Sequence, residues 1–155
     1  VILHSPNRLQ KDMKMEELKN KILKVLKSST VVSLATITAD GRPWVRYVSP
    51  KVCDCLTIKV ATSKSSRKVA QIKARREVHV TAGVLDINQP RPYVQYQAVA
   101  EILDDPQSKN EIWCEELGCY FKGPDDPDLC VIKIVPYCIE YMSFDAMEPQ
   151  IWQSR

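Results

Sequence analysis

The feature that most constrains the fold of this chain is a series of short segments in which apolar and polar residues alternate. In one of them, residues 94–102, the apolar residues Val94, Tyr96 and Ala98 are separated by the polar residues Gln95 and Gln97. A period of two places the apolar side chains on one face of a β-strand. Segments that alternate in this way, or are rich in β-branched residues, are 30–49, 56–60, 78–84, 94–102, 131–135 and 137–142.

Short turns connect most of these segments. Ala39-Asp40-Gly41 is a tight-turn signal in the middle of residues 30–49, which are therefore predicted to form a β-hairpin. Pro136 separates the last two segments, which are predicted to be a final pair of strands. Seven or so strands joined by short turns favour an antiparallel β-barrel over a parallel, doubly wound sheet.

Helical periodicity appears in three places, residues 13–27, 66–76 and 106–117, so the expected class is mainly β with peripheral helices (α+β). Residues 1–12 show no period and are expected to be an N-terminal extension. Residues 146–155 are expected to be a C-terminal tail. A chain of 155 residues is long enough for one domain, placed here at residues 13–145.

Hydropathy and cysteine use point to the cytoplasm. No apolar run approaches the ~20 residues of a membrane span, and residues 1–10 lack the pattern of a signal peptide. The six cysteines are then expected to be thiols. One residue separates Cys53 from Cys55, and only His4 and His79 offer imidazole, so no metal site is expected.

Positive charge is concentrated in one part of the chain. The net charge is only +3, but residues 59–76 hold seven basic side chains and no acid. A predicted strand is joined to a predicted helix by a segment that contains Thr62, Ser63, Ser66, Arg67 and Lys68. The free amides at the start of the helix, together with these hydroxyls and cations, suit the binding of a phosphate. The alternative is a serine-capped helix with solvated bases. Arg46 alternates with apolar neighbours, and a buried guanidinium needs an anion from a ligand or from the chain.

Four stretches together resemble the FMN-binding split-barrel superfamily that includes pyridoxamine 5′-phosphate oxidase, in its bacterial general stress protein branch. They are Thr-Ile-Thr-Ala-Asp-Gly-Arg-Pro-Trp-Val-Arg-Tyr-Val at 36–48, residues 62–72 with Ser-Arg-Lys-Val, Tyr-Val-Gln-Tyr-Gln-Ala-Val-Ala-Glu at 93–101, and Phe-Lys-Gly-Pro-Asp-Asp-Pro-Asp-Leu at 121–129. The resemblance extends over residues 15–142 and implies a split antiparallel β-barrel that works as a homodimer with FMN between the subunits.

The resemblance also implies roles for particular residues. Arg46, Arg67 and Lys68 would hold the FMN phosphate, and Ser66 and Thr62 would add hydrogen bonds, with Ser63 beside them. Along the isoalloxazine ring would run the strand of Arg46, Tyr47, Val48 and Ser49. Gln95 would face the ring or the ribityl chain, and Tyr120 and Phe121 would reach the ring from the second subunit.

The expected function is a flavin-dependent oxidoreductase that exchanges electrons with small molecules, without assigned catalytic residues. The C-terminal sequence Ile-Trp-Gln-Ser-Arg lacks the Arg-Leu-His segment of true pyridoxamine phosphate oxidases, so oxidation of vitamin B6 is not expected. One alternative is a non-catalytic module that stores, carries or senses flavin, FAD or a deazaflavin. Another is a nucleic-acid-binding barrel, which the acids of residues 101–128 disfavour. Neither nucleic acid nor membrane is an expected partner.

Overall fold

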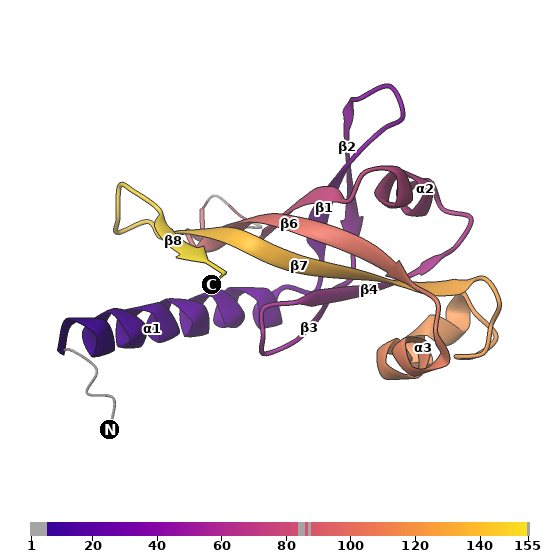
Figure 1. Ribbon diagram of the computed structural model, residues 1–155, viewed down its shortest axis with the longest axis horizontal. Coiled ribbons are helices and arrows are strands. Elements are labelled where there is room, and N and C mark those ends of the chain that lie inside the picture. The colour runs from indigo at the N-terminus through magenta and orange to yellow at the C-terminus, as the bar shows by residue number, and fades with distance from the viewer. Residues whose placement is uncertain (1–5, 84–85, 87, 155) are drawn as a thin grey trace.

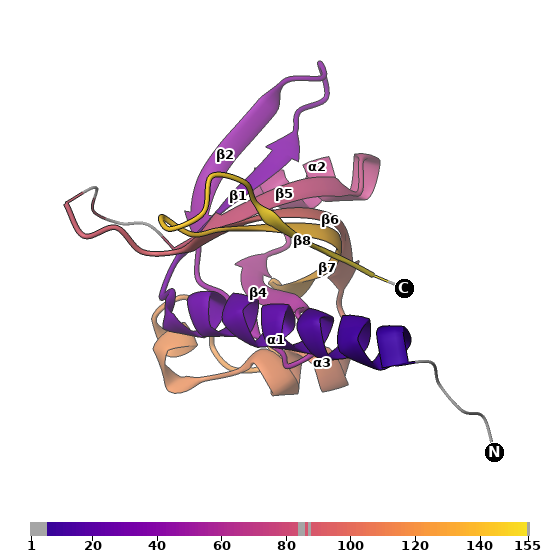
Figure 2. The ribbon, with the colours of Figure 1, turned by 90° about the vertical axis from the view of Figure 1, so that its left-hand side faces the viewer.

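A single antiparallel sheet forms most of the molecule. The computed structural model describes residues 6–83, 86 and 88–154 (Figure 1). Within the described residues the strands run in the order β2-β1-β5-β6-β7-β4-β3, and β8 pairs with β7. The sheet curls into a split barrel, which confirms the predicted fold class (Figures 1 and 2). The strands are β1 Val32–Ile37, β2 Pro43–Val48, β3 Lys51–Val52, β4 Ile58–Ser63, β5 Glu77–Ala82, β6 Tyr93–Leu103, β7 Leu129–Met142 and β8 Gln150–Gln153.

The alternation seen in the sequence separates the two faces of this sheet. Leu34 of β1, Val80 of β5 and Tyr96 of β6 lie in register, and all three are fully buried. Partners across antiparallel strands project from the same face, so these residues define the inner face of the barrel. The Tyr96 hydroxyl lies inside it and donates a 2.7 Å hydrogen bond to the carbonyl of Leu56.

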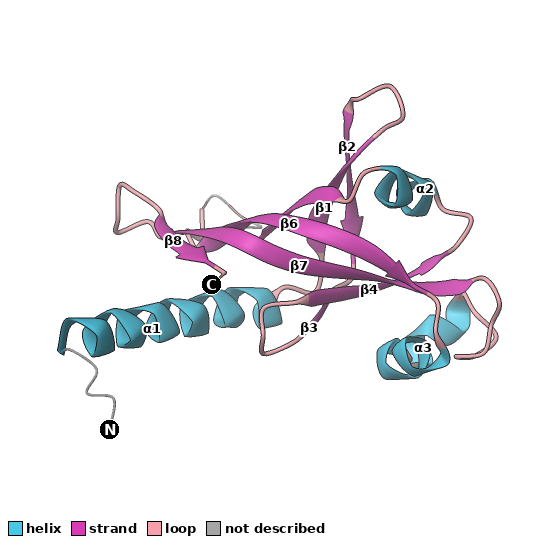
Figure 3. Ribbon diagram, in the orientation of Figure 1, coloured by secondary structure: helices cyan, strands magenta, loops and turns pink. Residues whose placement is uncertain are grey.

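Helices cover the barrel at separate places (Figure 3). Helix α1 (Pro6–Ser28) packs Ile22 and Leu26 into the core, while its first turns extend beyond the sheet (Figure 2). Helix α2 (Arg67–Ala74) buries Val69 and Ile72, and α3 (Pro106–Ile112) precedes the 3-10 helix η1 (Glu115–Cys119). Among the described helices, none combines the length and the apolar character that a membrane span requires.

The predicted final pair of strands is wrong, because β7 continues through Pro136 as one strand. Ala98 pairs with Pro136 and Gln97 with Cys138, so the register shifts by one residue at this point. On its other side β7 pairs with β4 up to Ile134 and with β8 from Cys138. Proline has no amide hydrogen, and it is tolerated here because Pro136 lies beside a bulge and, on the other side of β7, between the residues that pair with β4 and those that pair with β8.

Both chain ends contain more structure than the sequence indicated. Helix α1 already includes residues 6–12 of the expected N-terminal extension, whose residues 1–5 lie outside the described residues. Residues 150–153 of the expected tail pair with β7 as β8. The third predicted helix ends earlier, at Ile112, but it begins as expected: the Asp105 side chain accepts a 2.8 Å hydrogen bond from the amide of Ser108.

Candidate functional site

The junction between β4 and α2 is built as the sequence predicted. Strand β4 ends at Ser63, and α2 begins at Arg67 after the N-cap residue Ser66. The Ser66 side chain makes no capping hydrogen bond; its Oγ lies 3.3 Å from Oγ1 of the buried Thr62. Amides in the first turn of a helix have no intrahelical acceptor and carry partial positive charge. The Ser66 side chain therefore leaves the amides of the first turn of α2 without a side-chain cap.

Strand β2 brings a third cation to this junction from more than twenty residues away. Arg46 is in register with Leu34 and so lies on the inner face of the sheet, toward α2. Its Nη1 donates to Leu34 O (3.2 Å) and Thr36 Oγ1 (2.5 Å), and its Nη2 donates to Gln71 Oε1 of α2 (3.0 Å). These acceptors are neutral, so they fix the guanidinium in place without cancelling its charge. Three hydrogen bonds also leave donor capacity in a group that has five N–H bonds.

Arg67 is held against the same strand by an aromatic ring. Its Cζ lies 5.0 Å from the ring centroid of Trp44, which is two residues before Arg46 on the same face of β2. A guanidinium at this distance is attracted by the negative face of the ring. Trp44 is 45% exposed, so the stacked pair remains open to a ligand.

Arg46 is electrostatically coupled to Arg67, and Lys68 to Arg46. Burial lowers the pKa of Arg46, and the charge of Arg67 lowers it further. Burial also lowers the pKa of Lys68, with Arg46 as the next cause. Within the described residues, none of the three forms a salt bridge with an acid. We call Arg46, Arg67 and Lys68 the cation cluster; a bound anion would relieve its repulsion.

Other predicted site residues are placed differently. Ser63 Oγ donates to a carboxylate oxygen of Asp128 and lies 2.7 Å from Ser65 Oγ, so its hydroxyl is directed to the loop of residues 122–128. A carboxylate beside Ser63 makes this hydroxyl a poor phosphate donor. Thr62 and Ser66, in contrast, lie together beside the cation cluster.

The remaining predicted residues lie along β2 and β6. Tyr47 is 78% exposed. Successive cross-strand pairs across the sheet connect it to Thr81 of β5 and then to Gln95 of β6. Tyr47 and Gln95 therefore lie on the outer face of the sheet, opposite Arg46. Val48 is buried on the inner face, and Ser49 Oγ donates to Thr30 O at 3.5 Å. The structure thus groups only some of the predicted residues with the cation cluster.

Sequence reasoning missed the residues that position Arg46 and Arg67. Thr36 and Gln71 hold the guanidinium of Arg46, and Trp44 holds that of Arg67. Two signals were available: Trp44 alternates with Arg46 in the strand, and Gln71 is four residues after Arg67 and so on the same helix face.

Comparison with known proteins places the chain in a family. The family model described as Pyridoxamine 5′-phosphate oxidase matches residues 18–143. The chain belongs to this family. General stress protein 26 of Bacillus subtilis (strain 168) is 34% identical over 137 residues, which are 88% of this chain and 96% of that protein.

Solved structures of the family share the fold. The crystal structure of General Stress Protein 26 from Bacillus anthracis str. Sterne superposes with a TM-score of 0.77 at 28% identity, over 89% of this chain and 99% of that one. A pyridoxamine 5′-phosphate oxidase-related, FMN binding protein from Nostoc punctiforme superposes with a TM-score of 0.66 at 14% identity, over 87% and 86% of the two chains. The second likeness concerns the fold alone.

Proposed function

We propose that this chain binds FMN, with the flavin phosphate at the cation cluster, and that it is a flavin-dependent oxidoreductase. The observation that carries the proposal is the cluster itself, in which Arg46, Arg67 and Lys68 gather at the start of α2 without an acidic partner among the described residues. A phosphate dianion fits this donor set, because it accepts several charged hydrogen bonds at once. The FMN-binding relative of the same fold supports the choice of cofactor.

The protein's contribution is to fix the charges before the ligand arrives. Thr36 and Gln71 hold Arg46, and Trp44 holds Arg67, so little side-chain freedom is lost on binding. Partial burial of Lys68 strengthens its attraction for an anion, because less water screens its charge. Thr62 and Ser66 add hydroxyls at the same end of α2. Bound flavin would supply the hydride and electron transfer that side chains lack.

The visible spectrum of the purified protein tests this function. The protein as isolated, or after addition of FMN and removal of excess, should show the two visible flavin bands at one flavin per chain. Anaerobic NADH or NADPH should then bleach these bands, and an added electron acceptor should restore them. A protein that stays colourless after incubation with FMN would contradict the proposal.

A non-catalytic flavin-binding module is the second candidate, and the position of His79 favours it. His79 is the single histidine among the described residues, and it lies in register with Ala35 on the outer face of the sheet. Arg46 and its partners lie on the inner face, so no described imidazole accompanies the cation cluster as a proton donor. Flavin that binds at one per chain but is not bleached by anaerobic NADH or NADPH would support this second function.

The assembly we propose is a homodimer that covers the outer face of β2. This strand lies at the edge of the sheet, and its Val45 and Tyr47 are 61% and 78% exposed. Exposed apolar side chains on an edge strand are typical of an interface. Tyr47→Glu should convert a dimer to a single chain of 17.7 kDa in light scattering after gel filtration, whereas the control Phe144→Glu, at another exposed aromatic residue, should not. A wild-type protein that runs as one chain would refute the dimer.

We also propose that the protein resides in the cytoplasm. All six of its cysteines are unpaired, which is the usual state of cysteine in a reducing compartment.

A further inference from the structure

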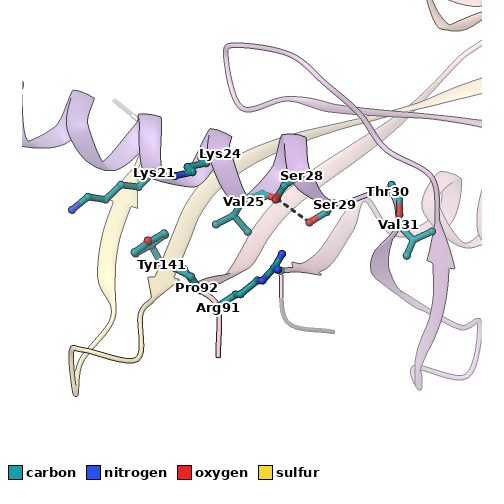
Figure 4. A pocket seen from close by; sticks show the side chains of 11 residues that line it. Lys21, Lys24, Val25, Ser28, Ser29, Thr30, Val31, Arg91, Pro92 and Tyr141 are labelled. Carbon is teal, nitrogen blue, oxygen red and sulfur yellow. Dashed lines mark hydrogen bonds between the residues drawn. The ribbon is translucent and has the colours of Figure 1, made fainter. Parts of the chain in front are cut away.

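A cavity with its own lining residues lies apart from the cation cluster. It has a volume of about 380 Å³ and opens between the C-terminal half of α1, the segment before β1 and the connection from β5 to β6 (Figure 4). None of the three residues of the cation cluster lines it. Any ligand of this cavity is therefore bound by other side chains.

The walls of this cavity are mainly apolar. Val25 of α1 and Tyr141 of β7 belong to the buried core and line the cavity. Val31 and Pro92 line it from the two loops, and Val31 is 41% exposed although it is apolar. Burial of such surface is favourable because it removes apolar area from water. The cavity therefore favours a ligand with an apolar body.

Two cations at the rim of the cavity lack an acidic partner. Lys24 comes from α1 and Arg91 from the segment before β6, and neither forms a salt bridge with any described residue. Lys21 differs, since its Nζ pairs with Glu17 at 3.2 Å and its side chain extends away from Arg91 (Figure 4). Lys24 and Arg91 are thus the two charges available to a ligand.

The end of α1 does not oppose a negative ligand here. Carbonyls at a helix C-terminus carry partial negative charge. In this helix Ser28 Oγ and Ser29 Oγ both donate to the carbonyl of Val25, at 2.8 and 2.9 Å. These two bonds offset part of the negative charge at this end of the helix.

A glycine allows the end of β5 to approach the segment that carries Arg91 closely. Gly83 has a φ of +127°, and a Cβ on it would lie 2.6 Å from the carbonyl oxygen of Pro92 and 2.7 Å from Cα of Tyr93. Only glycine allows the two backbone segments to approach so closely. The close contact holds Pro92, and therefore Arg91, opposite the end of α1.

We propose that this cavity binds a small organic anion with an apolar body. The body lies against Val25, Val31, Pro92 and Tyr141, and the carboxylate, sulfonate or phosphate group lies between Lys24 and Arg91. A cavity of this size suits a molecule of up to three rings. The proposal does not depend on flavin binding, because the two sites share no residue.

Two dyes with the same ring body test the proposal without flavin. The first, 8-anilinonaphthalene-1-sulfonate, carries a sulfonate, and the second, N-phenyl-1-naphthylamine, is uncharged; both fluoresce in apolar sites. The folded wild-type protein should bind one sulfonate dye per chain. The variant Lys24→Gln/Arg91→Gln should bind the sulfonate dye about tenfold or more weakly, because charged hydrogen bonds are lost. Its affinity for the uncharged dye should change less than about twofold, because the apolar walls remain.

Two further variants keep the test decisive. Val31 lines the cavity but is not part of the core, so Val31→Trp should fill the cavity and weaken the binding of both dyes. Arg67→Gln/Lys68→Gln removes the same charge from the cation cluster and should leave sulfonate-dye binding unchanged. The proposal is wrong if the Lys24/Arg91 variant binds the sulfonate dye as tightly as wild type, or if affinity is lost in the Arg67/Lys68 variant instead.

Discussion

Removal of two charges from the cation cluster should weaken FMN binding far more than it disturbs the fold. The variant Arg67→Gln/Lys68→Gln leaves Arg46 and its neutral partners Thr36 and Gln71 in place. Glutamine keeps much of each side chain's length and its helix propensity. The change is therefore mainly electrostatic.

The size of the loss follows from the exposure of the two side chains. A hydrogen bond to a charged group contributes about 1.5–3 kcal/mol, and the lower value applies to the exposed Arg67. With a similar contribution from the half-buried Lys68, the loss is about 3 kcal/mol, or roughly 100-fold in the dissociation constant for FMN. Titration of flavin fluorescence with flavin-free protein measures this constant directly.

The same loss of charge that weakens FMN binding should make the flavin-free protein more stable. Burial and the charge of Arg46 lower the pKa of Lys68, so its ammonium is held in the folded state at a cost in free energy. Lys68→Gln removes that repulsion and should raise the midpoint of thermal unfolding of the flavin-free protein. The wild-type protein should regain the difference when FMN is added.

A control on the same helix separates local charge from total charge. Lys73→Gln/Arg75→Gln removes two exposed cations from the other end of α2 and should change FMN affinity less than about threefold, a screened surface effect. If the Arg67/Lys68 variant bound FMN as tightly as wild type, or if both double variants lost affinity equally, the phosphate site would be wrongly assigned.

Three further outcomes follow from other contacts. Trp44→Leu should weaken FMN binding about twofold to fivefold, because an exposed cation–π contact that positions Arg67 contributes about 0.5–1 kcal/mol; unchanged affinity in the same titration would exclude this role. Tyr96→Phe should lower the free energy of unfolding by about 1–3 kcal/mol in urea, because the Leu56 carbonyl loses its partner inside the core; a smaller loss would mean that water replaces the hydroxyl. Burial lowers the pKa of His79, so stability should fall as the pH drops below its unfolded value of about 6.5, where the unfolded chain binds more protons; His79→Gln should flatten this part of the stability curve, and a parallel curve would assign the effect elsewhere.

The alternation of apolar and polar residues predicted the barrel well, because burial of one face determines which residues each strand carries on that face. The period of two in β5 and β6 corresponds to buried residues on one face, and Asp105 caps α3 as its position indicated. The prediction failed at Pro136, where local preference argued for a break. Long-range pairing overrides this preference, because the register between β6 and β7 shifts by one residue beside Pro136 and paired residues of β7 lie on either side of it.

The candidate site was only partly readable for a related reason. Hydroxyls and cations of residues 62–68 are contiguous, so sequence alone located the end of α2. Which hydroxyl faces the cations depends on contacts with distant segments: Asp128 binds Ser63, whereas Thr62 and Ser66 bind each other. Gln95 is similar, because its position on the outer face follows from the register of four strands.

The affinity of the wild-type protein for FMN, compared with its affinity for riboflavin, tests the central claim most directly. The two flavins have the same ring and ribityl chain and differ only in the phosphate. If the cation cluster binds that phosphate, FMN should bind at one per chain and about 100-fold or more tighter than riboflavin, as expected for two or three charged hydrogen bonds. Equal affinity for the two flavins, or no binding of either, would contradict the account.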